Sequence, residues 1–480
     1  MNGFDLINRK RNVLVFIIIL LFSIIVSFGV VFNYYLLILC LLPVIVFIYI
    51  IQPEFGIVFS FLSILNLIPF IDFYKSGIPG VFKLRDIPFL LAFLPLLKVI
   101  FIKKNNLNYA VRSPFLKWVF IFELWVFLVM LMTKLQFNVS WNLIIRSARD
   151  YYHYLLLIPF LYVFLDVKRR IRILKYLMFY ISICAIAYIV QSLTAVNFDW
   201  LLHSRTVPTE YFNRVYSRIV SASPIFLGLA IGKYVFKKSS NLKIFLSIVL
   251  FFLVCALSYT RALYFGLFVS FLLSYILTLK LDLRFSSKHL TLFFGIFMTL
   301  AVVGTFISQS PDWILNAFAD RIAQGIKDIK YREGTWGYRL TIMAPFLDVV
   351  RRNPWYGIGF LHKETGLLTF LPYGESGNAD IGIINLLAKL GIPGAILWIG
   401  LIYMVAKRIR YIFIPHFPHK VYIFGGLFFL LTAIFSSLTL LWFVSFFGII
   451  NVVFAIALIE ANIIEYEFIK GKNHIRLLSS

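Results

Sequence analysis

Long apolar runs recur along almost the whole chain and are separated by short polar turns. A helix of roughly 17 to 25 residues crosses the hydrocarbon core of a bilayer, so each apolar run of this length predicts a transmembrane helix. We expect about fourteen such helices, and therefore an all-α, polytopic integral membrane protein. The predicted helices begin near Val13, Tyr34, Phe55, Ile87, Phe115, Tyr152, Ile173, Ile219, Leu242, Ala262, Leu290, Asp380, Val421 and Trp442.

One long polar stretch, from Gln309 to Asn378, interrupts this pattern and is rich in arginine, tryptophan and glycine. It divides the chain into three predicted parts. Residues 1–308 hold transmembrane helices 1–11, residues 309–378 form a large external loop subdomain, and residues 379–480 hold helices 12–14 and a cytoplasmic tail. The first apolar run has basic residues before it and no small-residue cleavage site after it, which predicts an uncleaved helix.

Short basic clusters alternate along the predicted helices, and the positive-inside rule places these clusters in the cytoplasm. This orientation puts both chain termini in the cytoplasm and the 309–378 stretch outside. Cytoplasmic anchoring then accounts for most of the net charge of +25, so no nucleic acid partner is expected. The clusters are Lys103-Lys104, Lys168-Arg169-Arg170-Arg172, Lys237-Lys238, Lys280-Arg284-Lys288 and Lys407-Arg408-Arg410.

Few residues of the chain suit a metal or a cofactor. Cys40, Cys184 and Cys255 each lie in an apolar run, so we expect small core residues and no disulfide bonds. His416 and His419 have a metal-like spacing without a cysteine or carboxylate nearby, and we interpret them as part of a turn. The sequence has neither a glycine-rich phosphate loop nor an Asp-x-Asp pair, so we expect no cofactor and no metal.

A very short external turn, Ser258-Tyr259-Thr260-Arg261, joins two apolar runs. A guanidinium near the bilayer edge is costly, by roughly 2.5–3.5 kcal/mol at a helix centre and less near the interface. Arg261 therefore needs an anionic partner. That partner is either a bound ligand or the lipid headgroups to which the side chain extends.

A second candidate arginine, Arg339, lies within the 309–378 stretch. The residues from Leu340 to Val350 are apolar with helical periodicity, which predicts a short helix that ends at Arg351-Arg352-Asn353-Pro354. Arg339 would then lie at the helix start, where free N–H groups already favour an anion.

Aromatic residues and glycines surround this predicted helix, and the segment 355–360 predicts a tight turn. Aromatic rings beside an arginine suit a sugar, because a ring stacks on the apolar face of a pyranose. Structural packing is the alternative explanation. The candidate substrate-binding aromatic residues are Trp336, Tyr338, Trp355 and Tyr356.

Polar residues also open the predicted helix that begins near Asp380. Glu375 is a candidate general base. Asp380 and Asn385 lie at or within an apolar helix, where polar and ionisable groups are often functional. Helix capping by Asn378 and Asp380 is the alternative.

Two further external segments carry arginines. Residues 141–150 form a predicted amphipathic stretch with Arg146 and Arg149 one turn apart, and a later loop carries Arg205, Arg214 and Arg218. Each segment alone suits contact with lipid headgroups. Together the guanidinium groups suit a cleft that binds an anion, because a guanidinium can hold a phosphate through two parallel hydrogen bonds.

At these motifs the chain resembles the O-antigen polymerase and O-antigen ligase superfamily of lipid-linked polysaccharide enzymes. The resemblance covers residues 240–405 and implies a fold like that of the C-type glycosyltransferases. The motifs that carry it are Thr260-Arg261 with the small-residue helix that follows, Arg339 followed by Asn353-Pro354-Trp355-Tyr356-Gly357-Ile358-Gly359, and Asn378 through Leu390-Gly391-Ile392-Pro393-Gly394.

The resemblance implies an inverting, metal-independent glycosyl transfer at the outer face of the bacterial inner membrane, with a polyprenyl diphosphate as the leaving group. It implies that Arg261 and Arg339 bind the diphosphate, and Arg205, Arg214 and Arg218 are further candidates for this role. Asn378 is a candidate substrate-binding residue. The implied partners are a polyprenyl-diphosphate-linked oligosaccharide and membrane lipids, together with a chain-length regulator and a flippase of the same pathway.

Ligases that resemble this chain typically carry a histidine directly before the asparagine, whereas this position is Gly377 here. A polymerase that joins repeat units is therefore the preferred interpretation. A ligase that transfers a lipid-linked glycan to a lipid core or a protein, and a flippase for lipid-linked sugars, are the alternatives. The general base is open among Glu375, His362 and Asp380.

Overall fold

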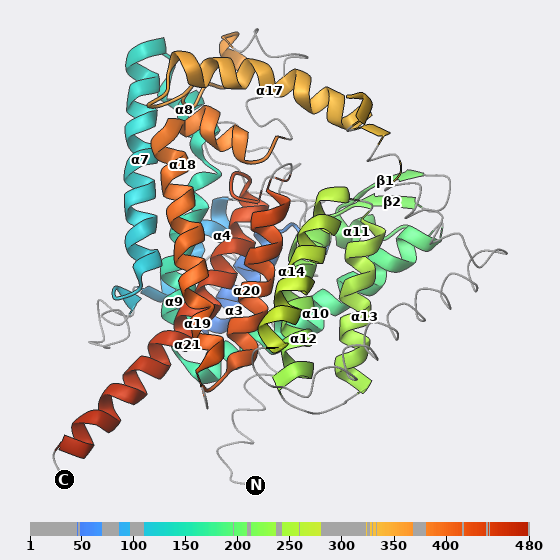
Figure 1. Ribbon diagram of the computed structural model, residues 1–480, viewed down its shortest axis with the longest axis vertical. Coiled ribbons are helices and arrows are strands. Elements are labelled where there is room, and N and C mark those ends of the chain that lie inside the picture. The colour runs from blue at the N-terminus through green and yellow to red at the C-terminus, as the bar shows by residue number, and fades with distance from the viewer. Residues whose placement is uncertain are drawn as a thin grey trace.

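The computed structural model describes residues 46, 49–69, 86–96, 110–194, 196–208, 213–236, 242–258, 260–279, 323, 327–328, 330–332, 334–367, 381–414, 417–437, 440 and 442–478. This part of the chain is mostly helical, and most of its helices run side by side between an upper and a lower end (Figure 1).

Within the described ranges, five helical segments are long and apolar enough to cross a membrane, and six shorter ones are also apolar. Each begins close to a predicted start. The long segments are α7 (Pro114–Phe137), α10 (Val167–Leu193), α12 (Ile219–Phe236), α18 with α19 (Ile383–Phe413) and Phe446–Ile469 within α21. The shorter ones are α3 (Pro53–Ile64), Asp86–Leu96, Tyr151–Phe164, α13 (Leu242–Leu257), Arg261–Leu277 and α20 (Lys420–Ser436).

The starts of three predicted helices, near Val13, Tyr34 and Leu290, lie outside the described residues. The number fourteen therefore stays a prediction. The division of the chain at residues 308 and 378 also lies outside the described ranges and stays a prediction.

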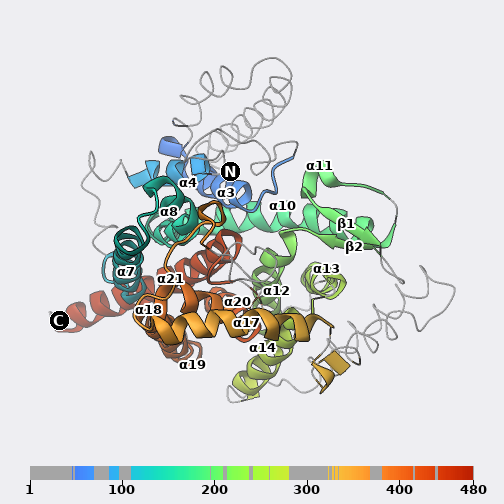
Figure 2. The same ribbon diagram turned by 90° about the horizontal axis from the view of Figure 1, so that it is seen from above.

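The helix α21 (Phe446–Leu478) forms the centre of the bundle. Its residues from Ile449 to Ile463 are buried on every side, which is typical of a helix that is apolar all round. Around it pack α20, α12, α3, the 3-10 helix η1 (Tyr151–Leu156) and α9 (Leu157–Phe164). Figure 2 shows α21 running outward from the bundle toward the C-terminal end of the chain.

At the lower end, arginines join neighbouring helices through carboxylates of α21. Arg408, near the end of α18, donates to Glu460 of α21 at 2.6 Å. Ser113 donates to the same carboxylate at 2.8 Å. Arg170, fully buried at the start of α10, lies 2.6 Å from Glu465. Each pair places opposite charges in direct contact, as burial of a charge requires.

The upper end differs from the all-α prediction, because it contains one two-stranded antiparallel sheet. The strands are β1 (Arg205–Pro208) and β2 (Asn213–Tyr216). They follow the short helix α11 (Asp199–Leu202), and Gln191, near the end of α10, forms hydrogen bonds with several residues of this segment. The Nε2 group of Gln191 lies 3.0 Å from Asp199 Oδ1 and 2.9 Å from Thr206 Oγ1.

The helix α17 (Gly334–Arg352) lies across the upper end, over α18 and α20 and toward α14 (Arg261–Leu279), as Figures 1 and 2 show together. It ends where the sequence predicts, directly before Asn353-Pro354. It begins earlier than predicted, at Gly334 instead of Leu340. The short helix α8 (Trp141–Ala148) lies at the same end of the bundle and bears out the predicted amphipathic stretch.

Candidate functional site

A pocket of about 310 Å³ opens at the upper end of the bundle. Three chain segments that are distant in sequence meet there: the end of β2 with the start of α12, the turn between α13 and α14, and the residues that lead into α21. A volume near 300 Å³ is at the lower end of the range for small-molecule sites. The lining residues are Val215, Tyr216, Ser217, Arg218, Val220, Ser221, Ser258, Thr260, Leu263, Leu440, Trp442 and Phe447.

The polar residues of this pocket are a cation and several hydroxyl groups. The guanidinium carbon of Arg218 lies 5.4 Å from the ring centre of Phe446, so the cation is held over an aromatic face. Ser258 donates to the carbonyl of Cys255 at 2.7 Å, and Thr260 donates to the carbonyl of Ser258 at 3.1 Å. Both hydroxyl oxygens can still accept hydrogen bonds, because each has lone pairs that donation does not use.

Arg261 lies directly beside this pocket, as the first residue of α14. The turn before it is as short as the sequence predicts, since α13 ends at Leu257. Its Nη1 group donates to Asp328 Oδ2 at 2.9 Å. Its Nη2 group is buried and has no hydrogen-bond partner within the described part of the chain. A buried donor without an acceptor is costly, so a ligand oxygen at this position would be stabilising.

The β1–β2 hairpin brings two more of the predicted arginines to the same region. The guanidinium carbon of Arg214 lies 4.5 Å from the ring centre of Tyr216, a residue of the pocket wall. Arg205 is paired with Tyr216 across the two strands. Arg205 and Arg214 therefore lie on one hairpin and Arg218 directly follows it, next to the turn that carries Arg261.

The structure corrects the local interpretation of Arg339. Because α17 begins at Gly334, Arg339 lies beyond the first turn of the helix and not at its start. Only the first turn has free N–H groups, so they do not act at this arginine. Tyr338 is exposed on the same helix, whereas the side chain of Trp336 lies outside the described set.

The turn that contains Trp355 and Tyr356 is docked, backbone to backbone, onto a break in α18. The amide of Ile358 donates to the carbonyl of Ala388 at 2.8 Å, and the amide of Ile392 donates to the carbonyl of Pro354 at 2.8 Å. The break lies at Gly391, whose φ is 67°. The Trp355 side chain is 69% exposed, so packing against the protein does not account for its position.

Glycine is required on both sides of this contact. A Cβ atom on Gly357, where φ is +62°, would lie 1.9 Å from the carbonyl oxygen of Ala388. A Cβ atom on Gly391 would lie 2.2 Å from the carbonyl oxygen of Trp355. The two glycine-containing motifs of the sequence therefore meet in space, and their first role is to hold α17 onto α18.

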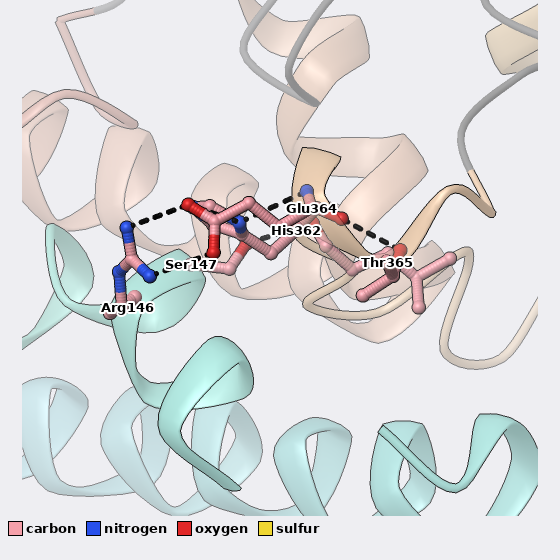
Figure 3. A network of polar contacts seen from close by, with 6 residues as sticks. Arg146, Ser147, His362, Glu364 and Thr365 are labelled. Carbon is pink, nitrogen blue, oxygen red and sulfur yellow. Dashed lines mark hydrogen bonds and ion pairs between the residues drawn. The ribbon is translucent and has the colours of Figure 1, made fainter. Parts of the chain in front are cut away.

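His362, one of the candidate bases, lies beyond the C-terminal end of α17 and belongs to a network of polar contacts with α8 (Figure 3). The amide of Glu364 donates to His362 Nδ1 at 3.3 Å. The carboxylate of Glu364 accepts two hydrogen bonds from Arg146 of α8, each 3.0 Å long. Ser147 donates to the carbonyl of Leu361 at 3.1 Å. These contacts fasten the 361–365 segment to α8.

A second pocket, of about 320 Å³, lies between α4 (Asp86–Leu91), α8 and η1. It contains Arg149, whose guanidinium lies 3.7 Å from Asp86, and His153, whose ring centre lies 6.1 Å from that of Phe446. The first residue of α21 thus stands between the two pockets. Arg146 and Arg149, one turn apart in sequence, serve different contacts.

The remaining candidates, Glu375, Asn378 and Asp380, lie outside the described residues. Among the residues that are described, no group of three or more His, Cys, Asp or Glu side chains is placed to hold a metal ion. Cys184 and Cys255 are buried as free thiols, as predicted, and Cys40 lies outside the described ranges.

Sequence reasoning missed several residues of the site. Asp328 pairs with Arg261, Trp442 and Phe447 line the pocket from a distant part of the chain, and Phe446 lies against the Arg218 guanidinium. The aspartate stands in a polar stretch and the aromatic residues stand in an apolar run, so neither differs from its neighbours in sequence. Only the folded chain places them beside the arginines.

Comparison with known proteins supports the resemblance found in the sequence. Residues 246–399, less than half of the chain, match the family described as O-antigen ligase. The matched segment includes the α13–α14 turn, α17 and the first part of α18. The similarity to the O-antigen polymerase and ligase superfamily is therefore confirmed over this segment. No curated protein matches the chain.

Proposed function

We propose, from this family match and the apolar helices, that the chain is a polysaccharide polymerase that joins polyprenyl-diphosphate-linked repeat units. The match itself supports O-antigen polymerase or ligase function in general, with lipid-linked oligosaccharides as substrates and membrane lipids as surroundings. The polymerase reaction, the diphosphate leaving group and the outer face of the bacterial inner membrane are the parts that we propose.

The observation that carries the proposal is one pocket lined by Arg218 and Thr260, with Arg261 directly beside it as the first residue of α14 within the matched segment. In the proposed reaction the oxygen of an acceptor hydroxyl bonds to the anomeric carbon of the donor sugar, on the face opposite the leaving group. The bond from that carbon to the diphosphate oxygen breaks. Polyprenyl diphosphate leaves with the electron pair, and the hydroxyl proton passes to a base.

Negative charge grows on the leaving diphosphate during this step. Fixed cations stabilise such charge most strongly where water is partly excluded. Arg218 lies on a buried aromatic side chain and Arg261 on a carboxylate, so both guanidinium groups are already oriented before the donor binds. Arg205, Arg214 and Arg339 supply further positive charge at the same end of the molecule.

The aromatic and hydroxyl groups of the pocket suit the sugar next to the diphosphate. Tyr216, Trp442 and Phe447 provide flat apolar surfaces, and Ser258 and Thr260 provide hydrogen-bonding oxygens. Trp336, Tyr338, Trp355, Tyr356 and Asn378 remain proposed substrate contacts.

The base is proposed to be one of Glu375, His362 and Asp380. Of these, His362 is the one whose surroundings are described, and it is attached to α8 through the Glu364–Arg146 pair.

A single experiment tests the polymerase against its alternatives. The purified protein in liposomes receives one lipid-linked repeat unit and nothing else. A polymerase forms a ladder of longer lipid-linked chains, because donor and acceptor are then the same species. A ligase forms no ladder, and yields a product only after a lipid core or a protein acceptor is added. Movement of the lipid-linked sugar between leaflets without any product would indicate a flippase.

The ligase is the second candidate because the matched family is described as O-antigen ligase. Against it stands Gly377, at the position where ligases that resemble this chain carry histidine. Product formation that depends on an added acceptor would overturn the polymerase proposal in favour of the ligase.

A further inference from the structure

Asp328 has no role in the function proposed above, yet it contacts the arginine at the centre of that function. Its Oδ2 atom lies 2.9 Å from Nη1 of Arg261. The Asp328 side chain is 9% exposed and that of Arg261 is 27% exposed. The two residues are 67 positions apart in sequence, so the contact joins the long polar stretch to the helix bundle.

The position of Arg261 explains why a carboxylate is needed there. Arg261 is the first residue of α14, and the start of a helix carries partial positive charge. A guanidinium at this point is repelled by the helix, and its long side chain is drawn instead toward water or lipid headgroups. A carboxylate beside it offsets the repulsion and fixes the side chain in one orientation.

The geometry of the contact leaves part of the guanidinium for another acceptor. The hydrogen bond to Asp328 uses only Nη1, in contrast to the two-bond arrangement that Arg146 forms with Glu364. Nη2 of Arg261 is buried and has no hydrogen-bond partner among the residues that the structure describes. A diphosphate oxygen beside Thr260 would satisfy this donor without displacing Asp328.

We infer that Asp328 is a positioning residue that holds Arg261 against the diphosphate of the lipid-linked donor. This inference rests on the function proposed above. Asp328 acts through Arg261 and does not itself contact the reacting atoms. Because the oriented guanidinium stabilises charge that appears during the reaction, its loss affects turnover more than substrate binding.

The test compares three variants of Asp328 in the ladder assay. Asp328→Ala removes the acceptor, Asp328→Asn keeps an acceptor without charge, and Asp328→Glu keeps the charge on a longer side chain. We expect Asp328→Ala to lower kcat by roughly 10- to 100-fold with a much smaller change in KM. Asp328→Glu should retain the most activity of the three variants.

A matched control comes from a second aspartate–arginine pair on the same polar stretch. Asp348 lies 2.7 Å from Arg352, but both side chains are exposed, at 50% and 76%. Asp348→Asn should leave kcat and KM unchanged. Wild-type kcat in Asp328→Ala would overturn the inference.

A purely structural role for the pair is tested by exchanging the two residues. The double variant Arg261→Asp with Asp328→Arg restores an ion pair, so the thermal midpoint should recover. Turnover should not recover, because the guanidinium then projects from the wrong segment. Recovery of turnover together with the midpoint would show that the pair is structural, and the positioning role would be withdrawn.

Failure of the proposed function is recognised separately, by binding. Polyprenyl diphosphate without sugar carries the full charge of the leaving group, and its affinity is measured directly on wild type and Asp328→Ala. If wild type forms no ladder but Asp328→Ala binds this probe at least tenfold more weakly, the polymerase proposal fails and the positioning role stands. Equal affinity in the two proteins would overturn the positioning role.

Discussion

The two ends of the helix bundle use arginine in different ways. At the lower end, Arg170 and Arg408 are enclosed by helices and each contacts a carboxylate of α21. At the upper end, Arg146 and Arg149 also pair with carboxylates, whereas Arg214 and Arg218, on the β1–β2 hairpin and directly after it, lie on the faces of aromatic rings. Arg261 has a carboxylate partner, but that partner belongs to a separate polar stretch and not to a neighbouring helix of the bundle.

The ion pairs of the lower end and the aromatic contacts of the hairpin hold the same side chain in different ways. A buried ion pair between two helices is complete in itself, and its value is lost when either partner is removed. A guanidinium on an aromatic face is oriented by a contact that uses its flat surface and leaves its edge directed elsewhere. Arg214 and Arg218 are therefore held by their flat faces, which agrees with the anion-binding role proposed for them above.

We expect the two ends of the bundle to face opposite sides of a membrane, and this is the largest effect predicted. A reporter fused after Gly366 should give an external signal, and one fused after Arg410 a cytoplasmic signal, because the basic clusters favour the cytoplasmic side. This is an all-or-none result. A cytoplasmic signal from Gly366 would remove the basis for an external active site.

The next largest effect is expected at Arg261. Arg261→Ala should lower kcat by roughly 10²- to 10³-fold, as the loss of one charge-stabilising donor does in other active sites. Protein level in the membrane should stay unchanged. Lysine should restore only part of the activity, because an ammonium group lacks the planar fork. The exposed Arg352 serves as the control, and Arg352→Ala should retain full turnover.

At the lower end, the loss should appear in stability and not in chemistry. Arg408→Ala leaves Glu460, which is 1% exposed, without its cation. We expect the free energy of unfolding to fall by about 3–5 kcal/mol. The double variant Arg408→Met with Glu460→Leu should recover most of it. A lower turnover per folded molecule at an unchanged thermal midpoint would contradict the assignment of this end to stability.

A smaller effect is expected where α17 is fastened to α18. Gly357→Ala places a methyl group against the carbonyl of Ala388, in addition to the strain of a positive φ. Gly366 is the matched control, since its φ is +68° but nothing lies within 4 Å of the added atom. Gly366→Ala should cost about 1–2 kcal/mol from backbone strain alone. Gly357→Ala should cost clearly more, and equal thermal midpoints would disprove the close contact.

The smallest effect is expected at the Arg146–Glu364 pair. Both side chains are partly exposed, at 26% and 49%, so solvent screens their attraction. Arg146→Gln should change the free energy of unfolding by less than about 1 kcal/mol. A much larger change in the free energy of unfolding, measured by chemical denaturation, would mean that this network stabilises the protein as much as the lower pairs do.

The sequence predicted those features that depend on neighbouring residues. The apolar runs indicate where most of the described helices begin, and the short turn before Arg261 follows from the spacing of two such runs. The start of α17 was misjudged because Gly334 and Gly337 disfavour a helix, and tertiary contacts override this preference. The β1–β2 hairpin has four-residue strands, which are too short to give a clear alternating pattern.

The candidate site depended more on contacts between distant residues. Sequence reasoning selected Arg261 by its charge beside an apolar run and Arg218 as one of the arginines of an external loop, and both lie at or beside the pocket. It gave no sign that Asp328 would face Arg261 or that Trp442 would line the pocket. Such partners are set by how helices pack, and one sequence does not contain that information in any local pattern.

The break in α18 imposes an order on biogenesis. Ala388 and Gly391 lie in a helix long enough to span a bilayer, yet the backbone at the break needs partners that come from the turn at residues 354–359. In hydrocarbon an unsatisfied peptide group costs several kcal/mol. During synthesis the turn is translated before α18, so it must wait undocked until Ala388 emerges. We therefore expect this helix to enter the lipid phase only together with the preceding turn, as one insertion unit.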